Sequence, residues 1–223
     1  MESIKVNVLS KGAEAILLLK LWYGMLVVEK IRISKRYRNP HLDVMLRRAR
    51  TILEARLLHE AKLLGIPVPA LIDIDIRRNS LTMEYIPGKR LRDSLERFDK
   101  DFIECLFRNI GENVGILHSN GIVHGDLTTS NMILTETGNV YLIDFGLGGH
   151  TWDLEDMGTD IHLMLRALES THTDIADLCF KAFINGYKKI MKDKTGEVLR
   201  KVKEIRSRGR YVAVEVRKSW RYY

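Results

Sequence analysis

The chain has 223 residues, of which 45% are hydrophobic and 29% are charged, and its formal net charge is +7 at pH 7. This length and composition fit one large domain or two small lobes with a substantial core. No apolar run approaches the roughly 20 residues of a membrane span. The first residues also lack the charged and then apolar order of a signal peptide, so we expect a cytoplasmic protein with no membrane segment.

The basic charge is unevenly distributed along the chain. Arg and Lys gather at residues 32–38 and 47–50, and again from residue 200 to the end. An uneven excess of this kind suggests a polyanionic partner, which could be a nucleotide, RNA or an acidic protein.

The first third of the chain alternates apolar and polar residues, as antiparallel strands do. Three strands are expected, at residues 4–10, 15–21 and 25–33. A long helix is then predicted from an N-cap at Asp43 to about Leu64, with Pro40 ending any helix before it. A second hairpin is predicted for residues 70–76 and 80–86, and Pro87-Gly88 follows as a hinge.

Beyond the hinge the pattern is mostly helical. Helices are expected at residues 90–98, 100–119, 153–170, 173–192 and 194–207. The two cysteines, Cys105 and Cys179, fall within apolar helical patterns, which predicts buried packing residues and neither a disulfide nor a metal site. The fold class is therefore α+β, with a small antiparallel lobe at residues 1–86 and a helical lobe at residues 87–223.

One stretch between these helices, residues 122–146, concentrates the chemistry. Two short apolar runs, MIL and VYLI, are separated by a turn-like segment, which predicts a hairpin. Polar residues stand at its ends: Asp126, Asn131 and Asp144. Phosphoryl transfer needs one carboxylate near the acceptor hydroxyl, here Asp126, and oxygen ligands for magnesium, here Asn131 and Asp144.

A lysine and a glutamate from the small lobe complete this hypothesis. Lys30 lies in the third predicted strand and Glu54 lies in the long predicted helix. An ammonium group that contacts nucleotide phosphates needs a carboxylate to hold it, and a strand and a helix of one lobe can bring the two together. Glu60 competes for the partner role, but Glu54 is preferred because it lies mid-helix.

These residues resemble the motifs of protein kinases. HGDLTTSN at 124–131 is similar to the catalytic loop, and Asp144-Phe145-Gly146 matches the DFG motif. The resemblance implies that Glu84 and Ile86 contact adenine through the hinge backbone, and that Asp160 supports the catalytic loop. The first turn, which replaces the glycine-rich loop, would contribute Gly12 and Glu14 to nucleotide binding.

The departures from that pattern are also informative. Gly125 stands where kinases have an arginine, no APE motif follows Gly146, and no GxGxxG motif is present. The resemblance therefore implies a minimal two-lobed kinase-like fold with a reduced helical lobe and almost no activation segment.

This set of departures resembles the small atypical kinase of the KEOPS complex, the PRPK-like family of archaea and eukaryotes. The matching segments are GAEA at 12–15, KRYRNPHLD at 35–43, RRARTILEARLL at 47–58, LESTH at 168–172 and RSRGR at 206–210. The resemblance implies an ATP- and Mg²⁺-dependent, non-specific serine/threonine kinase with ATPase activity. It would support threonylcarbamoyladenosine formation at adenosine 37 of tRNA.

The resemblance also implies partners. These are the ASKHA-fold threonylcarbamoyl-transferase subunit on the large lobe and a small regulatory subunit on the small lobe. The basic and aromatic tail, residues 207–223, suits tRNA by phosphate pairing and base stacking, although a solvated tail or a tail folded onto the cleft would also fit.

Two other functional classes remain open. A small-molecule kinase of the aminoglycoside phosphotransferase type shares HGDxxxxN, but the LESTH and RSRGR segments argue against it. A pseudokinase scaffold would only bind partners, and the presence of Lys30, Asp126, Asn131 and Asp144 argues against that class.

Overall fold

A computed structural model describes residues 7–219 and the side chains of residues 7–208. The chain divides into two units: one runs up to Arg90 and includes Asn131–Gly149, and the other consists of Leu91–Ser130 and the chain from His150 onward. These units differ from the predicted lobes in the placement of the 131–149 hairpin, which belongs to the first unit because a strand before Leu91 pairs with it.

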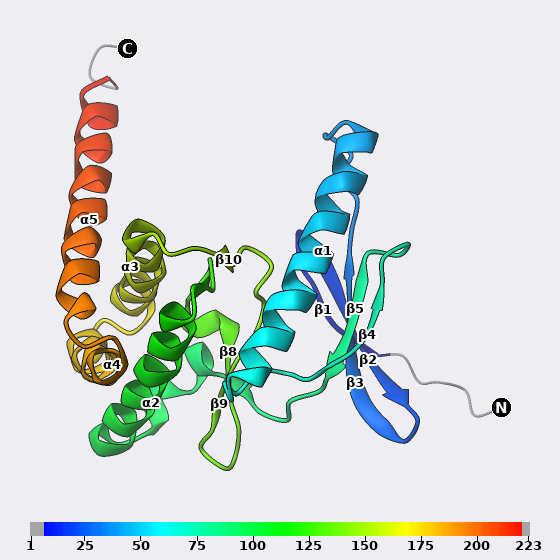
Figure 1. Ribbon diagram of the computed structural model, residues 1–223, viewed down its shortest axis with the longest axis horizontal. Helices are drawn as coiled ribbons and strands as arrows, with labels where there is room; N and C mark the ends of the chain where they lie inside the picture. Colours follow the sequence, from blue (N-terminus) through cyan, green and yellow to red (C-terminus); the bar gives the residue numbers. More distant parts are fainter. Residues whose placement is uncertain (1–6, 220–223) are drawn as a thin grey trace. The chain divides into compact units, whose positions relative to one another are not determined.

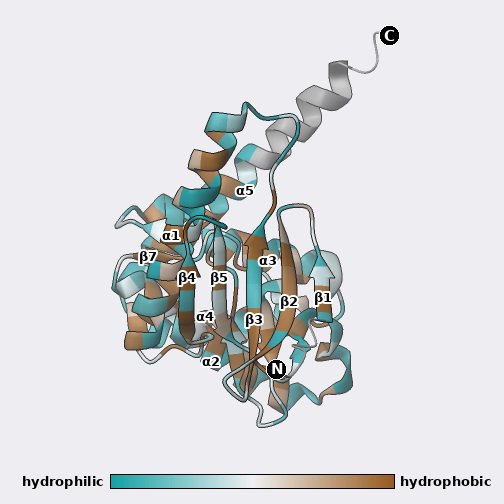
Figure 2. Ribbon diagram, turned by 90° about the vertical axis from the view of Figure 1, so that its right-hand side faces the viewer, coloured by the Kyte–Doolittle hydropathy of each residue, from teal (hydrophilic) through white to brown (hydrophobic). Residues whose placement is uncertain are grey.

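The first unit contains a five-stranded antiparallel sheet with the order β1-β2-β3-β5-β4 (Figure 2). Its strands are β1 Asn7–Lys11, β2 Ala15–Trp22, β3 Met25–Arg32, β4 Leu71–Asp75 and β5 Ser80–Glu84. Tyr23 and Gly24 join β2 to β3 with φ angles of 47° and 82°, as a two-residue hairpin turn requires. The predicted strands and the second hairpin are confirmed for the described residues, and β3 lies at the centre of the sheet.

One long helix, α1 (Pro40–Leu63), packs beside this sheet (Figure 1). Its N-cap is Asn39, whose side chain accepts a hydrogen bond from the backbone N of His41. The prediction that Asp43 is the N-cap of this helix is therefore wrong. Pro40, which was expected to end any helix before Asp43, is instead the first residue of α1. Proline suits the first helical position because its missing N–H would have no intrahelical partner there.

A second, three-stranded sheet in the first unit has the order β6-β8-β9. Its strands are β6 Lys89–Arg90, β8 Met132–Leu134 and β9 Val140–Leu142. The backbone N of Ile143 donates to the carbonyl of Asn131 at 3.0 Å, which extends the β8–β9 pairing beyond the strand ends. The predicted hairpin is confirmed, with Asn131 and Asp144 at its open end.

The second unit is helical. Its elements are η1 Leu91–Asp93, η2 Leu95–Arg97, α2 Lys100–Ser119, β7 Ile122–Val123, α3 Leu154–Thr171, α4 Ala176–Met191 and α5 Lys194–Ser219, and the short segments η3 Thr129–Asn131 and β10 Gly149–His150 adjoin the boundary between the units. Among the described residues, no helix combines the length and the apolar composition needed to cross a bilayer.

Three predictions for this unit are corrected. Residues 90–98 form two 3₁₀ turns and no α-helix: the backbone N–H groups of Ser94, Arg97 and Phe98 donate to the carbonyls three residues before them. The last helix continues to Ser219, past the predicted end at residue 207. Cys105 is exposed, whereas Cys179 is buried as predicted, and burial raises the pKa of its thiol to about 12.

Two glycines allow α2 and α4 to approach each other closely. A Cβ atom at Gly111 would overlap the carbonyl of Phe183, and a Cβ atom at Gly186 would overlap the carbonyl of Arg108. Backbone atoms cannot move aside as a flexible side chain can. This helix pair therefore depends on the absence of a side chain at both positions.

We expect Gly186→Ala to lower the free energy of unfolding by roughly 1–3 kcal/mol, because the added methyl group overpacks the α2–α4 contact. Gly196→Ala is the matched control, since Gly196 lies in α5 and a methyl group added there would meet open space. That control should stabilise the chain by up to about 1 kcal/mol through helix propensity. Chemical denaturation followed by circular dichroism compares the two, and equal midpoints would contradict the packing argument.

Candidate active site

Strand β3 and helix α1 together hold a buried charge cluster. Lys30 and Arg32 lie two residues apart on β3, so both side chains project from the same face of the sheet. The Lys30 Nζ donates to Glu54 Oε1 at 2.7 Å, and the Arg32 Nη2 donates to Glu54 Oε2 at 2.5 Å. Glu54 is fully buried, and Glu60 instead pairs with Arg56 on the exposed side of the helix. Glu54 is thus the partner of Lys30, as the sequence predicted.

The DFG segment also reaches this cluster. The Lys30 Nζ donates to Asp144 Oδ1 at 2.7 Å. Burial alone would raise the pKa of Asp144, but the ammonium of Lys30, the backbone N–H of Gly146 and the guanidinium of Arg32 together outweigh it and hold that pKa below its usual range. Asp144 has a φ angle of 65°, a left-handed conformation that is strained for a residue with a side chain.

Gly146 leaves room for the same arrangement. A Cβ atom at this position would meet the Arg32 guanidinium, Asp144 Oδ1 and Glu54 Oε2. Arg32 therefore lies against the DFG turn as well as against Glu54. The sequence reasoning gave Arg32 no role. Its signal was present, because Arg32 follows Lys30 at the period of two that places both side chains on one face of β3.

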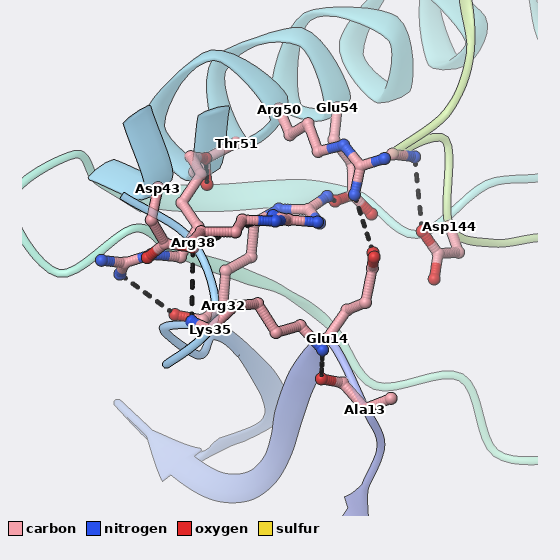
Figure 3. A network of polar contacts seen from close by, with 12 residues as sticks. Ala13, Glu14, Arg32, Lys35, Arg38, Asp43, Arg50, Thr51, Glu54 and Asp144 are labelled. Carbon is pink, nitrogen blue, oxygen red and sulfur yellow. Dashed lines mark hydrogen bonds and ion pairs between the residues drawn. The ribbon is translucent and has the colours of Figure 1, made fainter. Parts of the chain in front are cut away.

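A cavity of about 320 Å³ lies beside this cluster, entirely within the first unit. Six of the predicted site residues line it: Lys30, Glu54, Glu84, Ile86, Asn131 and Asp144. Gly12 and Glu14 do not line it, contrary to expectation. Glu14 is instead drawn away by Arg50 of α1, whose Nη1 donates to the Glu14 carboxylate at 2.8 Å (Figure 3).

Apolar side chains complete the cavity, and the sequence reasoning did not assign them. They are Leu9, Leu17, Val28, Met83, Ile133 and Ile143, with Pro69 beside them. They come from strands β1, β2, β3, β5 and β8 and from the segments that flank the strands. A cavity with apolar walls and a few charged groups at one end suits a planar base joined to phosphates.

The donors at the charged end fit a magnesium ion. Asn131 offers a neutral carbonyl oxygen and Asp144 an ionised carboxylate, and both line the cavity at the open end of the hairpin. Within residues 7–219, no group of three or more His, Cys, Asp or Glu residues could enclose a metal. Magnesium suits such a site, because it is typically held by one or two protein groups together with substrate phosphates.

The predicted catalytic loop lies in the second unit, so the structure assigns Asp126 to a different unit from Asn131 and Asp144. Asp160 of α3 holds this loop: its buried carboxylate accepts the backbone N–H groups of His124 at 2.6 Å and Gly125 at 2.8 Å. The predicted support of the loop by Asp160 is confirmed. Gly125 has a φ angle of 80°, which a residue with a side chain would adopt only under strain.

Further contacts connect Asp160 with the helices around it. His118 of α2 lies 3.3 Å from the Asp160 carboxylate through Nε2, and its Nδ1 lies 2.9 Å from the Tyr187 hydroxyl of α4. Burial would raise the pKa of Asp160, but hydrogen bonding and charge from His118, together with His124, hold it below its usual value. The carboxylate therefore remains ionised at neutral pH inside the core of this unit.

The two segments LESTH and RSRGR are coupled in space. Arg206 of α5 pairs with Glu169 of α3 at 2.8 Å. His172, which follows α3, places its Nε2 3.5 Å from the hydroxyl of Thr129 in the catalytic loop. These contacts connect the last helix, through α3, to the loop that carries Asp126. The remaining side chains of the predicted tRNA-binding tail, beyond Arg208, lie outside the described residues.

A family model shows the general class of this protein. A family model described as the protein kinase domain matches residues 43–160, which is more than half of the chain. The fold and the site therefore define a protein of the kinase type, reduced in its helical part.

Individual relatives of this chain show which family of kinase-type proteins it belongs to. The chain is 44% identical to "KEOPS complex subunit Bud32" of Pyrococcus abyssi, over 92% of this chain and 96% of that protein. It is 43% identical to a "Probable bifunctional tRNA threonylcarbamoyladenosine biosynthesis protein" of Methanothermobacter thermautotrophicus, of which it covers 36%, and 37% identical to a protein of the same description from Methanobrevibacter smithii, of which it covers 37%. This chain belongs to the family of the KEOPS subunit Bud32, and it spans about a third of the bifunctional relatives.

We expect Asp160→Asn to lower the free energy of unfolding at pH 7 by about 3 kcal/mol, because it removes a buried charge and places an amide donor beside backbone N–H donors. The folded pKa of Asp160 is lowered, so its contribution is complete above the unfolded pKa of about 4 and is lost as the pH falls through the folded value. The difference from the wild type should therefore shrink below pH 4.

Denaturation curves at several pH values measure this effect. Asp177→Asn is the matched control, because Asp177 is exposed on α4, and it should change the free energy of unfolding by no more than about 0.5 kcal/mol. A difference between Asp160→Asn and the wild type that stays constant down to pH 2 would contradict the argument.

Proposed function

We propose that this chain is an ATP- and Mg²⁺-dependent kinase and ATPase subunit of a KEOPS complex, which supports formation of threonylcarbamoyladenosine at adenosine 37 of tRNA. The observation that carries the proposal is the direct contact of Lys30 with Glu54 and Asp144 at one end of a base-sized cavity. Membership of the Bud32 family supports the assignment to a KEOPS complex and to the formation of threonylcarbamoyladenosine.

The cavity residues divide into distinct roles under this proposal. The main chain at Glu84 and Ile86 contacts the adenine, and the apolar walls exclude water from its faces. Lys30, held in place by Glu54, contacts the phosphates. Asn131 and Asp144 hold Mg²⁺, which neutralises phosphate charge when bound. Because Asp144 has a lowered pKa, it is ionised and able to act as a ligand at any physiological pH.

Asp126 orients the acceptor, which is a serine or threonine hydroxyl or a water molecule. Only seven residues separate Gly146 from the start of α3 at Leu154, so the chain offers little length for a peptide-binding segment. This economy favours water as a frequent acceptor and ATP hydrolysis as a principal activity.

The partners follow from the family. The threonylcarbamoyl-transferase subunit would contact the helical unit and a small regulatory subunit would contact the unit that holds the sheet. In the bifunctional relatives, the region similar to this chain makes up little more than a third of the protein and is joined to further sequence. This arrangement supports a close physical association of the present chain with a partner subunit. The basic tail would contact tRNA.

Radiolabelled phosphate transfer and release of free phosphate, measured with and without partner subunits and tRNA, distinguish this proposal from its alternatives. A pseudokinase scaffold shows neither activity under any condition. An aminoglycoside-type phosphotransferase transfers phosphate to a small molecule without any stimulation by partners or tRNA. A KEOPS subunit releases phosphate at a rate that the complex and tRNA increase.

We expect Asp126→Ala and Asp144→Ala each to reduce the rate of ATP turnover at least about 100-fold, since each removes a charged group at the reacting phosphate. Asp144→Ala should in addition weaken Mg²⁺-dependent ATP binding, measured by calorimetry, whereas Asp126→Ala should leave it nearly unchanged. Asp73→Ala, on the exposed part of β4, serves as a control for both. Full turnover in either variant refutes the assigned role.

We expect deletion of residues 207–223 to weaken tRNA-stimulated ATP hydrolysis about tenfold or more, and basal ATP binding much less, because the deletion removes several phosphate contacts. The deletion also removes the ion pair of Arg208 with Glu155 at 2.5 Å. Arg208→Ala therefore controls for that contact alone and should keep most of the stimulation. Unchanged stimulation in the truncated complex excludes this role of the tail.

A further inference from the structure

A dense basic surface lies in the first unit, away from the tail. It is formed by the end of β3, the connection to α1 and the first half of α1. Its cations are Arg32, Lys35, Arg36, Arg38, Arg47, Arg48 and Arg50. The carboxylates in contact with them are those of Glu14, Asp43 and Glu54 (Figure 3). Seven positive charges thus meet three negative ones, which leaves an excess of four. We call this set the α1 basic surface.

A small cavity at the centre of this surface is built to receive an acceptor atom. Arg32 lines it, is 6% exposed, and its Nε has no hydrogen-bond partner within the described residues. A buried guanidinium N–H without an acceptor is unfavourable. The cavity measures about 10 Å³, the size of one water molecule, so a single oxygen atom fits inside.

The mouth of this cavity is lined by further guanidinium groups. Arg38, Arg47 and Arg50 line it, and their side chains remain 25%, 17% and 32% exposed. Asp43 already occupies one side of Arg47, through a 2.8 Å bond to its Nε. Each of these arginines has five N–H donors, so the ion pairs leave donors available for a second anion. A phosphate group resting on the mouth would meet several of these donors at once.

An exposed aromatic ring adjoins these cations. Tyr37 is 79% exposed, and the guanidinium of Arg38 lies over its ring, 5.6 Å from the ring centroid. A large ring left in solvent within a basic loop does not contribute to the core. Aromatic rings beside arginine are the usual platform for unpaired RNA bases, which stack on the ring while the phosphates pair with the cations. A phosphopeptide needs the cations but not the ring.

We propose that the α1 basic surface binds RNA, with a backbone phosphate against Arg38, Arg47 and Arg50 and an unpaired base stacked on Tyr37. This inference rests on the proposed role in tRNA modification, and it adds a second RNA-contacting region to the tail. Phosphate pairing alone would bind any RNA, and the ring gives a preference for single-stranded segments.

Fluorescence anisotropy with the full chain, without nucleotide, tests the proposal. The probes are an unmodified tRNA transcript, a short single-stranded RNA and an RNA duplex of similar length. The variants are Tyr37→Ala and the double variant Arg38→Ala/Arg50→Ala, which removes two of the guanidinium groups at the proposed phosphate position and leaves the charge cluster at Glu54 in place. Arg77→Ala, in the exposed β4–β5 turn, and Arg56→Ala, on the second half of α1, are the matched controls.

Tyr37→Ala should weaken binding of the single strand at least about fivefold, the lower limit for loss of one stacked base, and should weaken duplex binding much less. The double arginine variant should weaken binding of all three probes and reduce the dependence of log Kd on log salt concentration by about 1–2. Both controls should bind like the wild type, and basal ATP hydrolysis should be unchanged in every variant.

Two outcomes would overturn the proposal. RNA binding unaffected by all three surface substitutions but abolished by tail deletion shows that the tail alone binds RNA. Displacement of bound RNA by a phosphoserine peptide at equal concentration shows a phosphopeptide site instead. If the wild type hydrolyses no ATP but still binds RNA through this surface, the proposed function is refuted and the present inference stands. The two failures are therefore distinguishable.

Discussion

One buried carboxylate, Glu54, organises the first unit. Its two oxygens bind different cations from the central strand, Lys30 through Oε1 and Arg32 through Oε2. A buried charge is costly unless it is paired and hydrogen-bonded, and removing one member of such a group leaves another uncompensated. The positions of β3 and α1 are therefore coupled through Glu54. Because Lys30 also binds Asp144, the same coupling extends to the DFG turn.

In the second unit, the buried carboxylate of Asp160 has a similar organising role. The catalytic loop has little regular secondary structure to fix its shape, so its backbone N–H groups need acceptors from elsewhere. Asp160 supplies both acceptor oxygens, to His124 and Gly125, from the rigid α3 helix. Each unit thus uses one buried carboxylate on a helix to fix an irregular functional segment. In both units the regular geometry of the helix fixes the position of the carboxylate more closely than a loop would.

The sequence predicted those features that depend on local periodicity. The strands and the hairpin at 131–144 follow from alternation, and the choice of Glu54 as the partner of Lys30 follows from its position in the middle of the helix. Features set by competition between individual hydrogen bonds were missed. Asn39 displaced Asp43 as the helix cap because its side chain reaches the first free N–H groups. Likewise Glu14 pairs with Arg50, which is distant in sequence, and does not line the larger cavity.

Arg32 connects the α1 basic surface, through its ion pair with Glu54, with the cavity proposed to bind a nucleotide. Its Nη2 binds Glu54, while its Nε belongs to the small cavity among the arginines of α1. The first turn is attached to the same surface, since Lys35 donates to the carbonyl of Ala13 and Arg50 binds Glu14. Glu54 lines one cavity and Arg32 lines the other, so a ligand in either cavity would contact one member of this ion pair. Thermodynamic linkage requires any effect of one ligand on the affinity of the other to be reciprocal. Under the two proposals above, the Arg32–Glu54 ion pair is therefore the route by which RNA and ATP would affect each other's binding within one unit.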